Sequence, residues 1–307
     1  MRVSALCLLL SCLLNAALPA RAAEPMSFIH PPPENASDKR HTYYWEILEA
    51  ALQSNRSKYG DYKVMSYGTP MNFQRAAAEV EAGEKGRINI VSRATNLELE
   101  ERLRAIPIPL DKGLLGYRMF LVMPETQTRL DKVQTLEELK QLTIGQASVW
   151  TDTKILGDNN FKLVLADNYE GLFQMLGVRR YDLFSRGAIE IHAEWLAHKD
   201  KIPGLAIEKK FVLAYPMPRY FFVPRNKDGE KMAERIEDGL RRLAKSGEFE
   251  RRYQAYKKLV LADLDLSGRK VFRLTNTQLS DKAPPLTDKF WWDDLAAELA
   301  PSNRTGR

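Results

Sequence analysis

The residues best suited to chemistry in this chain are arginines that follow predicted strands. Arg93 comes directly after the strand predicted over residues 87–92, and Arg102 lies further on in a Glu-rich stretch. Arg186 follows the strand predicted over residues 181–184. A guanidinium forks onto a carboxylate through two parallel hydrogen bonds, a geometry that no other side chain matches. The chemistry of the guanidinium group suits each of these residues to bind an anion, although a solvated helix surface is the alternative for Arg93 and Arg102.

A polar loop over residues 146–153 follows the strand predicted over residues 142–145. The polar side chains of the loop include those of Gln146, Ser148 and Thr151, which are the candidate ligand contacts. These groups precede a predicted helix, and the N–H groups at a helix start favour an anion. Trp150 stands between polar residues, which is hard to explain by burial in a core. We therefore expect Trp150 to stack on a ligand.

Catalytic and metal-binding patterns with recognisable spacing are missing from the sequence. The four histidines, His30, His41, His192 and His198, do not have metal-ligand spacing with cysteine or carboxylate residues. The sequence has no G-x-S-x-G, P-loop or G-x-G-x-x-G motif. The sequence therefore predicts a protein that is not an enzyme and holds no cofactor.

The first 22 residues have the pattern of a cleavable signal peptide. Arg2 gives a short basic start, residues 5–14 an apolar run, and Ala20-Arg21-Ala22 a cleavage motif. An apolar run of about ten residues is too short to span a membrane. Both cysteines, Cys7 and Cys12, lie inside this segment. The exported chain would then contain no disulfide and no thiolate.

Strands alternate with amphipathic helices along most of the chain. Strands are predicted over residues 27–29, 61–66, 87–92, 118–123, 142–145, 162–165, 181–184, 220–223 and 270–274. Helices between them begin at capping residues such as Asn168 or at the capping box formed by Thr135 and Glu138. This alternation implies βαβ units and an α/β fold with its functional loops at the carboxyl ends of the strands. The net charge of +6 includes Arg2 and Arg21 of the predicted signal peptide, and the remaining excess of about +4 comes from mixed-sign helices. No basic stretch has interleaved aromatic residues, which argues against nucleic-acid binding.

Three segments carry a resemblance to a known family: LEELKQLTIGQ (136–146), ADNYEGLFQML (166–176) and RRYDLF (179–184). In order and spacing they resemble the second lobe of the type 2 periplasmic solute-binding proteins, in particular the amino-acid-binding (family 3) proteins of ABC transporters. The resemblance extends over roughly residues 26–260. It implies a two-lobed α/β fold in which each lobe has a mixed sheet flanked by helices, with the ligand between the lobes. We expect residues 24–112 and 224–300 to form lobe I, residues 113–223 to form lobe II, and residues 301–307 to be a disordered tail.

The same resemblance assigns binding roles to particular residues. In the amino-acid-binding relatives, an arginine shortly after a Ser/Thr-bearing strand end holds the ligand carboxylate. The matching stretch here, residues 92–110, contains Thr95, with Arg102 as the better positional match and Arg93 as its rival. The relatives also carry an aspartate that pairs with the ligand ammonium, and here that position is Gly187, beside Arg186. With few carboxylates expected nearby, Arg186 predicts a second anionic ligand group, whereas Glu190 is the candidate replacement acid for a zwitterion.

The resemblance implies a monomeric periplasmic protein that captures a small polar, carboxylate-bearing solute by lobe closure. Such a solute would be an amino acid or a related organic acid, delivered to an ABC importer. A sensory module that signals to a membrane receptor or nucleotide cyclase is the alternative, because it needs the same lobes. A dehydratase with its reaction in the cleft is a minor alternative.

We predict that the mature protein begins at Ala23 or within two residues of it, because the cleavage motif ends at Ala22. Mass spectrometry of the exported protein measures this N-terminus directly. Leu9-Leu10-Ser11-Cys12 resembles a lipoprotein cleavage box, but the segment before it is short for an export signal. A diacylated Cys12 at the N-terminus would overturn the prediction.

Overall fold

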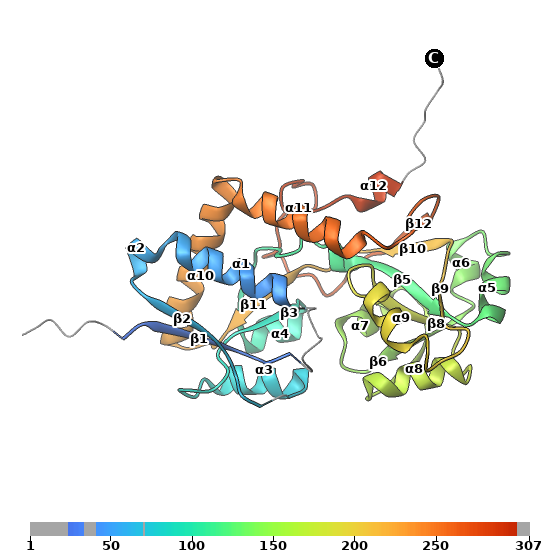
Figure 1. The fold of residues 1–307 in the computed structure, drawn as a ribbon, viewed down its shortest axis with the longest axis horizontal. Coiled ribbons are helices and arrows are strands. Elements are labelled where there is room, and N and C mark those ends of the chain that lie inside the picture. The colour runs from blue at the N-terminus through green and yellow to red at the C-terminus, as the bar shows by residue number, and fades with distance from the viewer. Residues whose placement is uncertain (1–23, 34–40, 70, 300–307) are drawn as a thin grey trace, which may run out of the picture.

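The computed structural model describes residues 24–33, 41–69 and 71–299, and these residues form two lobes that lie side by side (Figure 1). The predicted signal peptide (1–22) and disordered tail (301–307) lie outside the described residues. In the described part of the chain, no helix combines the length and apolar character that crossing a membrane requires.

Lobe I contains two small sheets covered by helices. β1 (Met26–His30) pairs in parallel with β2 (Tyr62–Ser66). In the other sheet, β11 (Arg219–Val223) lies antiparallel between β3 (Val91–Ala94) and β4 (Arg104–Ile106). The helices of this lobe are α1 (Thr42–Ser54), α2 (Arg56–Tyr59), α3 (Phe73–Ala82), α4 (Leu97–Arg102), α10 (Lys227–Lys245) and α11 (Glu248–Leu261).

Lobe II is built on one mixed sheet in the order β12-β10-β5-β8-β6-β7, with β9 pairing beside β5. Its strands are β5 (Tyr117–Val122), β6 (Thr143–Ala147), β7 (Lys162–Ala166), β8 (Leu183–Gly187), β9 (Ala206–Ile207), β10 (Phe211–Ala214) and β12 (Lys270–Arg273). Its helices are α5 (Pro124–Leu130), α6 (Leu136–Leu139), α7 (Thr151–Asp158), α8 (Tyr169–Gly177) and α9 (Ile191–His198). The 3₁₀ turn η1 (Leu114–Gly116) precedes the sheet, and α12 (Leu295–Leu299) ends the described chain.

Local signals in the sequence set several of these boundaries. The predicted capping box is present, because the Thr135 hydroxyl accepts from the backbone N–H of Glu138 and the Glu138 carboxylate accepts from that of Thr135. Asn168 caps α8 through its side chain, as expected. The strand predicted over residues 87–92 is displaced, since β3 begins only at Val91. The stretch before β3 hydrogen-bonds to β1 instead, through the N–H of Asn89 and the carbonyl of Ile29 (2.9 Å).

Two strands lie in sheets that the predicted lobe boundaries did not anticipate. β11 was expected at the end of lobe II but pairs with β3 and β4, and its Phe221 and Val223 pack in the core beneath α1 and α10. β12 was expected in lobe I but pairs in parallel with β10 at the edge of the lobe II sheet. Both differences arise from long-range strand pairing, which the local hydrophobic pattern does not specify.

Two of the chain segments that cross between the lobes touch each other. The first runs through η1 into β5, and the second connects β10 to β11 over residues 215–218. The N–H of Tyr215 donates to the carbonyl of Gly116 (3.2 Å). A Cβ atom on Gly116 would lie 1.9 Å from the carbonyl oxygen of Tyr215. Only glycine therefore permits the two crossovers to approach this closely.

The chain beyond α11 also contacts both lobes. After β12, the Asn276 amide donates to the carbonyl of Pro216 in the second crossover (2.7 Å). The Ser280 hydroxyl then donates to the carboxylate of Glu100 in α4 (2.7 Å). Further on, Asp293 forms an ion pair with Lys257 of α11 (2.9 Å). The segment 270–299 thus lies along the side of the molecule where the crossovers run (Figure 1).

We predict that Gly116→Ala lowers the free energy of unfolding by about 1–3 kcal/mol, the usual cost of overpacking a buried site. Urea denaturation measures the change. Gly68→Ala is the matched control, because no atom lies within 4 Å of the Cβ it would add. Equal stability of the two variants would show that the crossovers separate without cost.

Candidate ligand-binding cleft

A cavity of about 710 Å³ lies between the lobes and is lined by residues of both. Lobe I contributes the start of α1, the start of α3, and the facing ends of β3 and β11. Lobe II contributes the loop before α7, the start of α8 and the turn between β8 and α9. The cavity thus lies where strands end and helices begin, as expected for a small-molecule site in an α/β fold.

The lobe I wall presents two guanidinium groups, those of Arg93 and Arg219. Arg93 donates to the carbonyl of Phe73 (3.2 Å) and lies over the Phe73 ring, 4.2 Å from its centroid. Arg219 donates to the carbonyl of Ser92 (3.0 Å) and lies 4.6 Å from the ring centroid of Tyr44. Across residues 24–33, 41–69 and 71–299, neither guanidinium forms an ion pair with a carboxylate.

The electrostatics of this wall favour an anion. Burial, together with the like charge of Arg219, lowers the pKa of Arg93 to about 9. The acid that interacts electrostatically with Arg219 is Asp111, which is buried behind Tyr44 and accepts a hydrogen bond from its hydroxyl (3.2 Å). Burial raises the pKa of Asp111 to about 6, although Arg219 and Tyr44 act in the opposite direction. One buried aspartate against two guanidiniums leaves this wall with a net positive charge at neutral pH.

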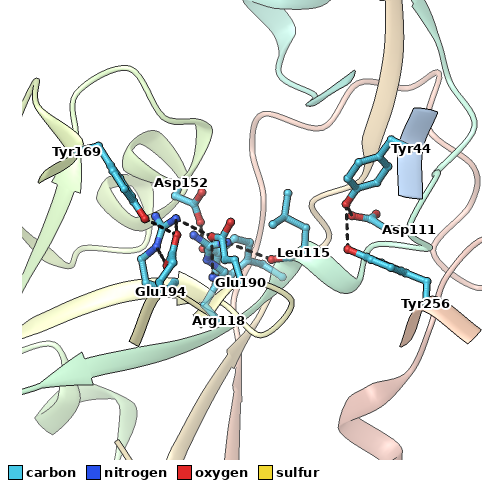
Figure 2. Close-up of polar contacts among 12 residues, drawn as sticks. Tyr44, Asp111, Leu115, Arg118, Asp152, Tyr169, Glu190, Glu194 and Tyr256 are labelled. Atoms are coloured by element: carbon cyan, nitrogen blue, oxygen red, sulfur yellow. Dashed lines mark hydrogen bonds and ion pairs between the residues drawn. The ribbon is translucent and has the colours of Figure 1, made fainter. Parts of the chain in front are cut away.

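The lobe II wall is organised around Arg118, whose side chain is 2% exposed. Figure 2 shows Arg118 between Asp152 of α7 and Glu190, the residue before α9. Its guanidinium lies 3.0 Å from the Asp152 carboxylate and 3.6 Å from that of Glu190. It also donates to the carbonyl of Leu115 in the first crossover (3.2 Å). Tyr215, where the second crossover begins, donates its hydroxyl to the same Asp152.

Arg186 completes this network on β8. Its guanidinium donates two hydrogen bonds of 2.6 Å to Glu194 and lies 3.0 Å from Glu190. Burial lowers the pKa of Arg186, but the two carboxylates raise it well above the ordinary value. The expectation that few carboxylates lie near Arg186 is therefore wrong. Its partner Glu194 lies on α9, the helix that follows β8. The separation of eight residues along the chain gave no indication that the two side chains pair.

The polar loop of lobe II leads into a helix start that carries a negative charge, whereas the sequence predicted a loop that favours an anion. α7 begins at Thr151 and carries Asp152 in its first turn, and Asp152 lines the cavity. A carboxylate thus lies where the sequence predicted an anionic ligand group. Asp152, Glu190 and Glu194 together face two guanidiniums, so this wall has no excess of positive charge.

Six of the nine predicted site residues line the cavity. They are Arg93, Ser148, Trp150, Thr151, Arg186 and Glu190. The Trp150 ring lies in the wall, 4.6 Å from the guanidinium of Arg186.

The other three predicted residues lie outside the lining. Arg102 is 37% exposed and pairs with Glu81 (2.7 Å) and Glu98 (3.3 Å) on the surface. Thr95 is buried, and its hydroxyl donates to Glu100. Gln146 is buried in β6, and neither polar atom of its amide has a hydrogen-bond partner among the described residues. Gln146 is explained by the alternation of side chains along a strand, because a one-residue shift reverses the direction in which a side chain points.

The predicted site residues did not include four charged residues of the cavity, namely Arg118, Asp152, Asp167 and Arg219. Arg118 and Arg219 both stand at the starts of strands that follow a crossover. The Pro- and Gly-rich crossover segments were visible in the sequence. The first charged residue after each one was therefore a usable signal.

No family model matches this chain, and no curated protein matches it in sequence. Its structure is similar to an arginine-specific periplasmic binding protein of Salmonella typhimurium, with 14% identity and a TM-score of 0.52 over 75% of this chain and 98% of that one. The structure is also similar to an ancestral arginine-binding protein bound to arginine, with 19% identity and a TM-score of 0.50. That match covers 75% of this chain and 97% of the other. A histidine kinase sensor domain with similarity to periplasmic binding proteins has 11% identity and a TM-score of 0.50. The match covers 76% of this chain and 96% of that one.

This chain has the two-lobed fold of the periplasmic binding proteins. At these identities the property shared with the solved structures is the fold. In this periplasmic binding protein fold, the cavity described above separates a cationic lobe I wall from a lobe II wall whose arginines are neutralised.

We predict that Arg186→Ala lowers the free energy of unfolding by about 3–5 kcal/mol, because it leaves the buried Glu194 without its cation. Arg102→Ala is the matched control and should cost less than about 1 kcal/mol, since its partners are exposed. Urea denaturation of the two variants gives both values. A stable Arg186→Ala protein would mean that Glu194 does not depend on this pairing.

Proposed function

We propose that this protein is a periplasmic solute-binding protein that captures a small carboxylate-bearing solute and delivers it to an ABC importer. The solute is an amino acid or a related organic acid. The observation that supports this proposal is the pair Arg93 and Arg219, two guanidiniums that face the cavity without a carboxylate ion pair among the described residues.

The anion requirement follows from the cost of burying charge. A guanidinium that leaves water must recover its hydration through hydrogen bonds or an opposite charge. Arg93 recovers one carbonyl contact, and Arg219 recovers another together with a contact to a ring nitrogen of His41 (3.3 Å). The two cations also repel each other. A ligand carboxylate between them would offset the repulsion and accept charge-assisted hydrogen bonds.

Capture by closure follows from the position of the cavity. A ligand that contacts both lobes stabilises the arrangement in which both walls reach it. The Asn96 amide of lobe I donates to the hydroxyl of Thr151, which lines the cavity on the lobe II side (3.1 Å), so the two lobes are in contact beside the cavity. A membrane partner that distinguishes the closed form would then read ligand occupancy.

Sensing is the second candidate function, and the similarity in fold to a histidine kinase sensor domain supports it. The two functions require the same cleft and differ in the membrane partner. Co-purification of the tagged protein from cross-linked cells separates them. A permease and its ATPase would support transport, whereas a receptor or nucleotide cyclase would support sensing.

We predict that Arg93→Ala weakens binding of a carboxylate ligand by about 2–5 kcal/mol, the range for removing one partner of a buried charge pair. The ligand is first identified by a thermal-shift screen of amino acids, di-acids and sugar acids, and calorimetry then gives the affinity. The variant should fold normally, because Arg93 has no acidic partner to leave behind among the described residues.

Arg102→Ala serves as the control, since Arg102 lies outside the cavity and should leave the affinity unchanged. Unchanged affinity in Arg93→Ala, or a wild-type protein that binds cationic ligands lacking a carboxylate, would contradict the proposed function.

A further inference from the structure

A second compartment of about 120 Å³ lies in lobe I beside the cleft. It is lined by the carboxyl end of β1, the start of α1, the start of α3 and part of β3. Its apolar side chains include Trp45, Met71, Phe73, Ala76 and Val91. Carboxyl ends of strands are where open α/β sheets bind ligands. The compartment therefore lies where the fold places recognition groups, and of the predicted ligand-binding residues its lining includes Arg93.

The compartment shares part of its lining with the cleft. His41, Phe73 and Arg93 line both. Arg93 extends over the Phe73 ring, so its guanidinium lies on the common wall. A ligand whose carboxylate is held by Arg93 would therefore have the compartment next to its charged end.

One polar group in the compartment is left unsatisfied. Ser92, which is 4% exposed, lines it, and the Ser92 hydroxyl has no hydrogen-bond partner among the described residues. A buried hydroxyl without a partner is unfavourable and uncommon in folded proteins. A polar atom on the occupant of the compartment would supply the missing bond.

The size of the compartment limits its occupant. An apolar cavity of about 150 Å³ in another protein binds benzene. The compartment, at about 120 Å³, is smaller than that cavity, so its occupant is at most one ring or one branched alkyl group. The aromatic walls, Trp45 and Phe73, favour a ring, because aromatic pairs gain energy beyond their buried area.

We propose that this compartment is a subsite for an uncharged, ring-sized arm of the ligand, and that Ser92 recognises a hydroxyl group on that arm. The ligand class is thereby an aromatic carboxylate rather than a short aliphatic acid. This inference rests on the proposed function, because the carboxylate at Arg93 positions the arm.

Three probes test the subsite by calorimetry: acetate, phenylacetate and 4-hydroxyphenylacetate. Phenylacetate should bind the wild-type protein at least about tenfold more tightly than acetate, since burial of a ring is favourable. The hydroxylated probe should bind about two- to tenfold more tightly again, the range for one hydrogen bond.

Two variants locate the effect. Ala76→Leu fills the compartment from α3 and should remove the advantage of phenylacetate while acetate binding persists. Ser92→Ala should remove only the preference for the hydroxylated probe. Ala78→Leu is the matched control, because Ala78 lies on the exposed face of the same helix. Thermal melting of each variant confirms folding, and Ser92→Ala tests the subsite independently if Ala76→Leu does not fold.

The outcomes separate the two proposals. Binding of acetate and phenylacetate with equal affinity, or a ring preference that survives in Ala76→Leu, would overturn the subsite and leave the carboxylate site standing. Failure of all three probes and of every carboxylate in the thermal-shift screen would overturn the proposed function itself.

Discussion

Among the described residues, four guanidinium groups line one cavity, and each must replace the hydration that it loses there. In lobe II the carboxylates of Asp152, Glu190 and Glu194 surround the two arginines and replace the lost hydration. In lobe I the lost hydration is replaced only in part, by backbone carbonyls, aromatic rings and one buried aspartate. The cleft is therefore asymmetric in charge, and this asymmetry underlies both the anionic nature of the proposed ligand and the lobe to which its charged group would bind.

The same network links the cavity wall to the connections between the lobes. Arg118 contacts a wall carboxylate and the carbonyl of Leu115 in the first crossover. Tyr215 reaches the same carboxylate from the second crossover. A change in the position of Asp152 would therefore alter the contacts that both crossovers make with the cavity wall. A continuous set of packed and hydrogen-bonded contacts is one route by which energetic coupling passes from a binding site to the rest of a protein.

Short-range signals in the sequence were sufficient for much of the fold. Helix caps such as Thr135 and Asn168 were confirmed because the capping groups lie within four residues of one another. The alternation of strands and helices predicted the α/β class for the same reason. The pairing of β11 and β12 was not predicted, because each joins a strand that is remote in the sequence.

The candidate site shows the same division. Arg93 and Trp150 were found because strand ends and loop tryptophans are local features. Arg186 was placed correctly in the wall, but its charge balance depends on Glu194, which only the packing of α9 brings near. The resemblance to the amino-acid-binding proteins favours Arg102 over Arg93, yet Arg102 lies at the end of α4 and pairs with glutamates on the surface.

The C-terminal segment has a consequence for solubility. β10 consists of buried apolar residues, and without a neighbour on its outer side it would be an open edge of the lobe II sheet. β12 covers that edge and exposes Lys270 and Arg273 in its place. Charged residues on an outer strand discourage pairing between molecules, whereas an apolar open edge promotes it. A chain that lost this segment by proteolysis would expose the apolar edge of β10 to other molecules. The last strand therefore limits self-association of the protein.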